Sequence, residues 1–211
     1  MTSPFDQSSY QVRFDWGVDG LRRLAPSDVV IVVDVIGFTS RAVEAVARGE
    51  DVAIAGSGSV SEGAVGAEAA AAPAHGPLVL AGALRNAAAV ATAVLSEQVR
   101  RGGRTSIAVV ATGESDAAAD GRTRFAVEDL LGAGAIIAAL SDLGIDHSSP
   151  EAVATAESFR ALRRAVKHLM TASGSGRALE GSPHHADVRA AAKIDDADVV
   201  PVLRGGVFTA G

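Results

Sequence analysis

The chain has 211 residues, of which 48% are hydrophobic and 21% are charged, a composition typical of a globular protein. It contains no cysteine, which excludes disulfides, thiolate nucleophiles and cysteine-bound metals and favours a reducing compartment. The formal net charge of −6 argues against a nucleic-acid partner and against binding to an anionic membrane, because both require a basic face.

The sequence has no apolar signal-peptide core near its start and no run of about 20 apolar residues that would span a membrane. We therefore expect a cytoplasmic protein that folds as a single domain over residues 1–211. Alanine-rich helices are able to pack within one chain or across a dimer, and a homodimer is the expected assembly.

Short β-branched runs alternate with alanine-rich runs, and this alternation predicts an α/β fold. The clearest strand is 28–35, whose central residues Val29–Val33 are all apolar, so we expect both of its faces to be buried. Gly37 and Phe38 end this strand. Thr39 or Ser40 is then expected to cap a helix that runs to Gly49.

The middle of the chain continues the alternation. The expected elements are, in chain order, a strand at 52–55, a helix from a Ser59/Glu62 capping box through Ala72, a strand at 77–81, a helix at 86–99, a strand at 106–110 and a polar loop at 113–123.

A helix is expected at 127–143 despite Gly132 and Gly134, each of which costs about 1 kcal/mol relative to alanine in a helix interior. The two glycines therefore predict that a strand or a ligand lies close to this helix. Ser149 and Pro150 predict the start of a helix that runs to residue 170. A glycine- and serine-rich loop at 173–182 and a C-terminal hairpin at 199–209, turning at Gly205-Gly206, complete the chain.

Asp34 has the most chemical content, since it ends an apolar strand just before a glycine-containing turn into a helix. Ligands bind at this position in open α/β sheets. The alternative is that Asp34 only caps the turn through its own backbone. Thr39, Ser40 and the helix amides behind them favour a ligand, because they are donors for an anionic oxygen.

Glu128 and Asp129 are adjacent carboxylates at the start of a predicted helix. The helix dipole alone favours acids there, which is the structural alternative to a site. Adjacent helical residues point about 100° apart, so we expect only one of them to face a given site. Arg85 and Asn86 precede another helix, with Asn86 as a candidate N-cap and Arg85 as a candidate phosphate or sulfonate ligand.

Two further patterns carry weaker signals. Gly56-Ser57-Gly58-Ser59 lacks the third glycine of a dinucleotide loop and the lysine of a Walker loop, and is read as a flexible turn. The histidines at 184 and 185 are adjacent rather than three or four residues apart, which argues against a helical metal site.

Four stretches and a Trp16-Gly17 pair together resemble the 2-phosphosulfolactate phosphatase family, in the same order and over nearly the whole chain. The stretches are VVIVVDVIGFTS at 29–40, LAGALRNA at 80–87, AVEDLLGAG at 126–134 and DVVPVL at 198–203.

The resemblance implies a three-layer α/β/α fold with a largely parallel or mixed central sheet. It also implies magnesium-dependent hydrolysis of the phosphate ester of a small sulfonated acid, 2-phosphosulfolactate, a step towards coenzyme M. Positions Asp34, Asn86, Glu128 and Asp129 carry over from the family motifs.

Physical chemistry supports a metal independently, because phosphate-monoester hydrolysis is among the slowest uncatalysed reactions and a divalent ion neutralises the phosphate oxygens. Magnesium prefers one or two carboxylates with water and phosphate oxygens. We therefore predict that Asp34 binds Mg²⁺ together with Glu128 or Asp129. Asp34 is predicted to act as a metal ligand or as an acid–base group, with Asn86 and Arg85 as catalytic residues that orient the phosphate.

The remaining expected contacts are those of Thr39, Ser40 and Arg41, which we predict to bind a small phosphorylated or sulfonated acid. A second hypothesis is a family member without catalytic activity that binds an anionic metabolite or a protein partner. It rests on the segment between the second strand and the 86–99 helix, which has no counterpart to the family's Gly-Asn-Ser-Pro and Thr-Asn-Gly-Thr motifs.

Overall fold

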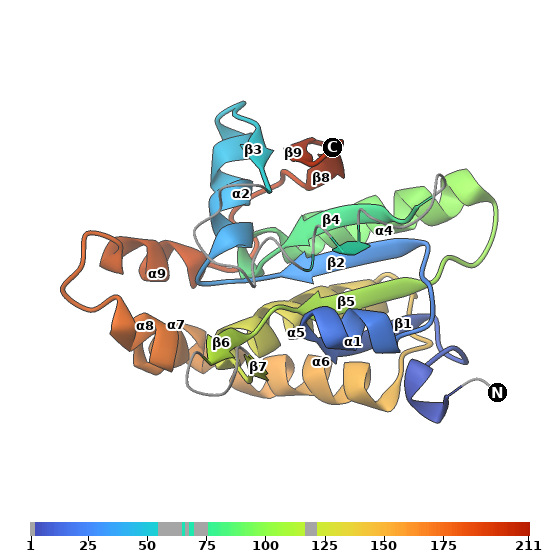
Figure 1. Cartoon of the computed structure of the whole chain (residues 1–211), viewed down its shortest axis with the longest axis horizontal. Helices are drawn as coiled ribbons and strands as arrows, with labels where there is room; N and C mark the ends of the chain where they lie inside the picture. Colours follow the sequence, from blue (N-terminus) through green and yellow to red (C-terminus); the bar gives the residue numbers. More distant parts are fainter. Residues whose placement is uncertain (1–2, 55–64, 66–67, 70–75, 117–121) are drawn as a thin grey trace.

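The computed structural model describes residues 3–54, 65, 68–69, 76–116 and 122–211. Within these residues, seven strands form one mixed sheet in the order β1-β5-β2-β4-β8-β9-β3, and helices cover both of its faces (Figure 1). The predicted α/β fold is confirmed.

Four neighbouring strands are parallel: β1 (Val12–Trp16), β5 (Ile107–Ala111), β2 (Val29–Val33) and β4 (Leu78–Gly82). Val33, the last residue of β2, pairs with Ala111 of β5 and with Gly82 of β4. The three strands therefore end at the same level, and the segments that follow them meet at one edge of the sheet.

The other strands are antiparallel: β8 (Pro201–Arg204), β9 (Val207–Ala210) and the short edge strand β3 (Val52–Ala53). Gly205 and Gly206 connect β8 to β9 with φ angles of 58° and 84°. A two-residue hairpin with both central residues in this region is the type that favours glycine. The predicted C-terminal hairpin is confirmed.

Each face of the sheet has its own hydrophobic core, and β2 contributes to both. Val29, Ile31 and Val33 pack with α4 to α7 and α9 on one face, while Val30 and Val32 pack with Phe38 and Phe208 on the other, which α1 and α2 cover. All five β2 residues are buried, as predicted for a central strand. The helices are α1 (Gly17–Arg23), α2 (Phe38–Ala47), α4 (Ala87–Arg101), α5 (Val127–Asp142), α6 (Pro150–Leu162), α7 (Val166–Ala172), α8 (Gly174–Ala178) and α9 (His185–Ala191).

The two glycines of α5 lie where other elements approach the helix closely. A Cβ atom on Gly132 would lie 2.4 Å from Cγ2 of Val35, and one on Gly134 would lie 2.4 Å from the carbonyl oxygen of Thr155 in α6. The predicted close approach is confirmed. The neighbours are Val35, two residues after the end of β2, and the helix α6.

The single helix expected from Pro150 to residue 170 is wrong. A 3-10 turn, η4 (Arg163–Ala165), separates α6 from α7. The tighter turn redirects the chain, so that Val166 and Met170 become buried in the core while Leu162 stays partly exposed.

Two expected loops contain regular structure instead. Ser173 accepts a hydrogen bond from Gly176 N (3.0 Å) and caps α8, so the cap overrides the poor helix propensity of a Gly-Ser segment. The polar loop at 113–123 contains two paired strands, β6 (Glu114–Asp116) and β7 (Arg122–Arg124). β1, α1 and α9 lie in segments where the sequence pattern predicted no helix or strand.

Several other boundaries differ from expectation. α2 begins at Phe38 with Gly37 in the N-cap position, so neither Thr39 nor Ser40 caps it. A 3-10 turn, η2 (Leu84–Asn86), precedes α4. The Gly56–Ser59 turn and the Ser59/Glu62 capping box lie outside the described residues, as do residue 55 and Ala72, the predicted ends of the strand and helix there.

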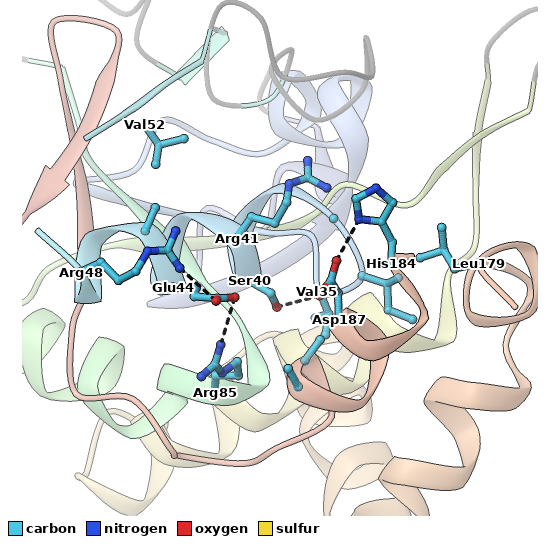
Figure 2. Close-up of a pocket in the computed structure, with 15 residues that line it drawn as sticks. Val35, Ser40, Arg41, Glu44, Arg48, Val52, Arg85, Leu179, His184 and Asp187 are labelled. Carbon is cyan, nitrogen blue, oxygen red and sulfur yellow. Dashed lines mark hydrogen bonds and ion pairs between the residues drawn. The ribbon is translucent and has the colours of Figure 1, made fainter. Parts of the chain in front are cut away.

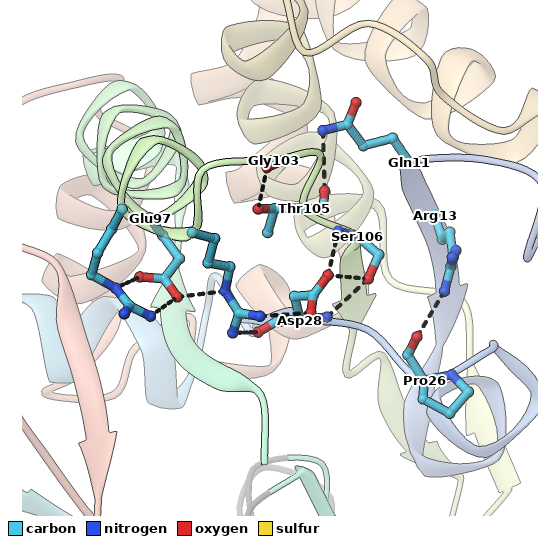
Figure 3. A network of polar contacts seen from close by, with 10 residues as sticks. Gln11, Arg13, Pro26, Asp28, Glu97, Gly103, Thr105 and Ser106 are labelled. Carbon is cyan, nitrogen blue, oxygen red and sulfur yellow. Dashed lines mark hydrogen bonds and ion pairs between the residues drawn. The ribbon is translucent and has the colours of Figure 1, made fainter. Parts of the chain in front are cut away.

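The opposite, amino-terminal edge of the parallel strands carries a network of ion pairs and hydrogen bonds (Figure 3). Asp28 Oδ2 accepts hydrogen bonds from the backbone N (2.8 Å) and the hydroxyl (2.7 Å) of Ser106. Arg101 donates to Asp28 Oδ1 (2.7 Å) and to Glu97 Oε1 (2.7 Å). The network joins β2, β5 and α4, and its role is structural.

Glu97→Gln is expected to reveal this stabilisation through its pH dependence. The hydrogen bond from Arg100 and a further one from Arg101 lower the pKa of Glu97 to about 2, against the opposing effect of burial. A carboxyl group whose pKa is lower in the folded than in the unfolded state stabilises the protein above its unfolded pKa, and this stabilisation is lost as the pH falls to the folded pKa.

The variant should therefore lose about 1–2 kcal/mol of unfolding free energy at pH 7. The difference from wild type should disappear between about pH 4.3 and the folded pKa of about 2. Urea unfolding at a series of pH values measures it, with Glu157→Gln, an exposed partner of Arg160, as the control. If the difference in unfolding free energy between wild type and Glu97→Gln did not change with pH, the stabilisation would not come from the ionised Glu97 carboxylate.

Candidate active site

Asp34 lies in the connection between β2 and α2, and its backbone and carboxylate are both tied to the start of α2. Its N–H donates to Thr39 Oγ1 (3.0 Å), and its Oδ2 accepts from Phe38 N (2.8 Å). A Cβ on Gly37 would lie 2.2 Å from Asp34 Oδ1, so a side chain at that position would collide with the carboxylate. Asp34 thus does cap its own turn, and 8% of its surface stays exposed.

Thr39 and Ser40 hold this connection in place through their hydroxyl groups. Thr39 Oγ1 donates to Asp34 O (2.6 Å), and Ser40 Oγ donates to Val35 O (2.6 Å). Thr39 is completely buried. These bonds support a positioning role for Thr39, whereas Ser40 also reaches the surface of a pocket described below.

Asp129, in the first turn of α5, joins the segments that follow β2 and β5. Its Oδ1 accepts from Val35 N (2.8 Å), and its Oδ2 accepts from Thr112 Oγ1 (3.1 Å) and Gly113 N (2.9 Å). Its pKa is raised well above the ordinary value, first by burial and then by the charge of Asp34, although two of its hydrogen bonds act in the opposite direction. Asp34 and Asp129 thus form a buried pair of interacting carboxylates.

Glu128 is also buried but contacts a different part of the molecule. The hydroxyl of Ser175 in α8 forms short contacts with carboxylate oxygens of both Glu128 and Glu114. The two adjacent acids face different parts of the molecule, as expected. Asp129 accepts a hydrogen bond from the backbone N of Val35, next to Asp34, whereas Glu128 contacts Ser175 in α8.

Asn86 has no exposed surface, and within the described residues its side chain bonds to three backbone groups. Its Oδ1 accepts from Ala83 N (2.9 Å), while its Nδ2 donates to Ala81 O (3.2 Å) and Val199 O (3.1 Å). The side chain makes no capping bond to α4. These contacts link the end of β4 to the segment that leads into β8 and favour a positioning role over direct contact with phosphate.

Arg85 is held in place by a bidentate ion pair with Asp196. Its Nε and Nη2 donate to the two carboxylate oxygens of Asp196 at 2.8 and 3.2 Å, and its Nη1 lies 4.0 Å from Glu44 Oε2. The pKa of Asp196 is lowered, with the bond from Arg85 as the largest cause. Arg85 therefore presents a fixed, mostly buried guanidinium group.

A pocket of about 570 Å³ opens beside the β2–α2 connection. α2 supplies one wall, Arg85 and the Val35–Gly37 segment border it, and α9 with the residue before it supplies another (Figure 2). Its charged and ionisable lining residues are Arg41, Glu44, Arg48, Arg85, His184 and Asp187. The pocket thus combines a surplus of arginines with proximity to the Asp34–Asp129 pair.

A comparison with models of protein families gives a match to 2-phosphosulpholactate phosphatase over residues 53–206, more than half of the chain. The chain belongs to this family. No curated protein matches the sequence. The matched residues include Arg85, Asn86 and the Glu128-Asp129 pair of this 2-phosphosulpholactate phosphatase family member, whereas Asp34 precedes them.

The three carboxylates predicted as metal ligands do not form one cluster in this family member. Within the described residues, no group of three or more His, Cys, Asp or Glu side chains is arranged to hold a metal ion. The structure pairs Asp34 with Asp129 and directs Glu128 to Ser175. In the same part of the chain, no helix combines the length and apolar character needed to cross a membrane.

Sequence reasoning missed several residues of the site. Thr112 and Gly113 follow a buried strand directly, so the strand-end rule that selected Asp34 would also have selected them. Ser175 and Asp196 have no comparable local signal, because their partners Glu128 and Arg85 lie 47 and 111 residues away in sequence.

Proposed function

We propose that the protein is a magnesium-dependent phosphatase that hydrolyses the phosphate ester of a small acidic metabolite, with 2-phosphosulfolactate giving sulfolactate and phosphate. The observation that carries this proposal is the buried Asp34–Asp129 pair beside an arginine-lined pocket. Family membership gives the substrate class. The position at the carboxyl ends of parallel strands is where α/β proteins bind ligands.

The chemistry of the pair fits a divalent cation. The two carboxylates repel each other, which contributes to the raised pKa of Asp129, and a bound cation would offset that repulsion. Asp129 already accepts three hydrogen bonds, so Asp34 is the principal candidate ligand and Asp129 supports it. Magnesium would supply neutralisation of the phosphate oxygens and activation of a water molecule.

The pocket residues have distinct roles in this proposal. Arg85, oriented by Asp196, and Arg41 on α2 recognise the phosphate and the second acidic group, since a guanidinium group matches the geometry of such oxygens. Gly37 and Ser40 line the part of the pocket wall that lies next to Asp34. Asn86 keeps the Ala83–Arg85 segment in register with β4.

A non-catalytic family member that binds an anionic metabolite is the second candidate function. The ion pairs already made by two pocket arginines favour it: Arg85 binds Asp196, while Arg48 binds Glu44 and Glu50. Such pairs give a fixed binding surface without requiring turnover.

Phosphate release from a panel of small phosphorylated acids, with magnesium or with EDTA, tests the proposal. We expect turnover of 2-phosphosulfolactate with magnesium and its loss with EDTA. The panel includes 2-phosphoglycerate, which lacks the sulfonate group, and a lower rate is expected with it. Calorimetric binding of sulfolactate or phosphate in the presence of magnesium without turnover would support the non-catalytic candidate. If neither binding nor turnover is observed, both candidate functions are ruled out.

A further inference from the structure

His184 and Asp187 form a hydrogen-bonded pair on the α9 side of the pocket (Figure 2). The Nδ1 atom of His184 lies 3.1 Å from Oδ2 of Asp187. The backbone fixes the pair as well, because His184 N donates to Ser182 Oγ (3.2 Å) and Asp187 N donates to His184 O (3.0 Å). With Nδ1 turned towards the carboxylate, the shape of the imidazole ring directs Nε2 away from it.

The same pocket is bounded by His184 and by Gly37, where a Cβ atom would collide with the Asp34 carboxylate. A phosphate ester bound there with its phosphoryl group at the β2–α2 connection places its organic part towards α9. We propose that His184 is the general acid that protonates the leaving oxygen of the ester, and that Asp187 is the residue that positions it. This inference rests on the proposed phosphatase function.

The proposed step balances without any further reactant. Water attacks phosphorus, and the bond between phosphorus and the ester oxygen breaks. One hydrogen of the water stays on the hydrogen phosphate that forms and its other proton passes to solvent, while the ester oxygen takes a proton from Nε2 of His184. The products are the free alcohol and inorganic phosphate. Asp187 holds Nδ1 and thereby leaves Nε2 as the atom available for transfer. The side chain of His184 is 71% exposed, so solvent returns the proton after each turnover.

The proposal narrows the substrate class. An alkoxide is a poor leaving group that requires a proton, whereas p-nitrophenolate departs without one. A site with a general acid at this position is adapted to alkyl phosphates such as the ester of a 2-hydroxy acid. Loss of the acid should therefore affect alkyl esters far more than p-nitrophenyl phosphate.

The test compares His184→Gln with wild type on 2-phosphosulfolactate, 2-phosphoglycerate and p-nitrophenyl phosphate, with magnesium present. We expect kcat for the alkyl esters to fall about 10²-fold or more, the range for loss of a general acid. We expect kcat for p-nitrophenyl phosphate to change less than about threefold, since its leaving group needs no acid. Asp187→Asn should show the same selectivity with a smaller loss.

His168→Gln, an exposed histidine on α7, is the matched control and should leave all rates unchanged. Equal losses on both kinds of ester, or no loss, overturn the role of His184. The same holds if wild type cleaves only p-nitrophenyl phosphate. If wild type hydrolyses no ester in the panel, the proposed phosphatase function fails and this inference fails with it. A failure of the His184 role alone is recognised by an active wild type and no selective loss in His184→Gln.

Discussion

Asp34→Asn is expected to lower kcat/KM for the phosphate ester about 10²- to 10⁴-fold, the range for removal of a metal ligand or an acid–base group. Asparagine keeps an oxygen that accepts the bond from Phe38 N, so the connection to α2 should be retained while the charge is lost. Phosphate release with magnesium measures the effect. Asp19→Asn, at a side chain that is 88% exposed, is the control.

Stability measurements separate this effect from misfolding. The pKa of Asp129 is raised in the folded state, so ionisation of Asp129 destabilises the protein above its unfolded pKa. Removing the neighbouring charge of Asp34 reduces that cost. The variant should therefore be as stable as wild type or more stable in EDTA at neutral pH, and should gain less stability from added magnesium. Unchanged activity in Asp34→Asn would remove Asp34 from the site.

Asn86→Ala is expected to reduce the free energy of unfolding by about 2–4 kcal/mol. The change leaves Ala83 N, Ala81 O and Val199 O without this partner, at a position where the side chain of Asn86 is fully buried. Urea unfolding monitored by circular dichroism measures the loss. Ser96→Ala in α4, the helix that follows Asn86, removes an exposed hydroxyl and should stay within about 0.5 kcal/mol of wild type.

The same variant distinguishes two roles of Asn86. A positioning residue should give a destabilised protein whose remaining activity follows its folded fraction. A protein that is as stable as wild type but inactive would instead assign Asn86 to direct contact with the substrate, as the sequence analysis predicted.

The parts of the fold that follow from local pattern were predictable. The run Val29–Val33 identified the central strand, and Gly205-Gly206 identified the hairpin. Gly132 and Gly134 indicated a close approach to α5, although the sequence did not indicate which elements approach it. The proximity of Asp34 and Asp129 was also predictable, because strand ends and helix starts meet at one edge of a parallel sheet.

Partner choice within the site was not predictable. The ion pair of Arg85 with Asp196 joins residues 111 positions apart, and it replaces the expected open guanidinium group. Asn86 is of a residue type and in a position typical of an N-cap. Its side-chain amide instead bonds to backbone groups of Ala81 and Ala83, which precede it, and of Val199, which is distant in sequence. A local window of sequence contains no information on which of several possible partners is nearest in space.

The edge strand β3 has a consequence for how the chain is completed during synthesis. β3 joins the sheet through β9 near the C-terminus, although Val52 and Ala53 are made long before Val207. Val52 and α9 both line the pocket, whereas the Asp34–Asp129 pair depends on segments that leave the ribosome earlier. A nascent chain would therefore be able to assemble its carboxylate pair before the pocket wall formed by α9, because α9 is translated after the segments that hold Asp34 and Asp129.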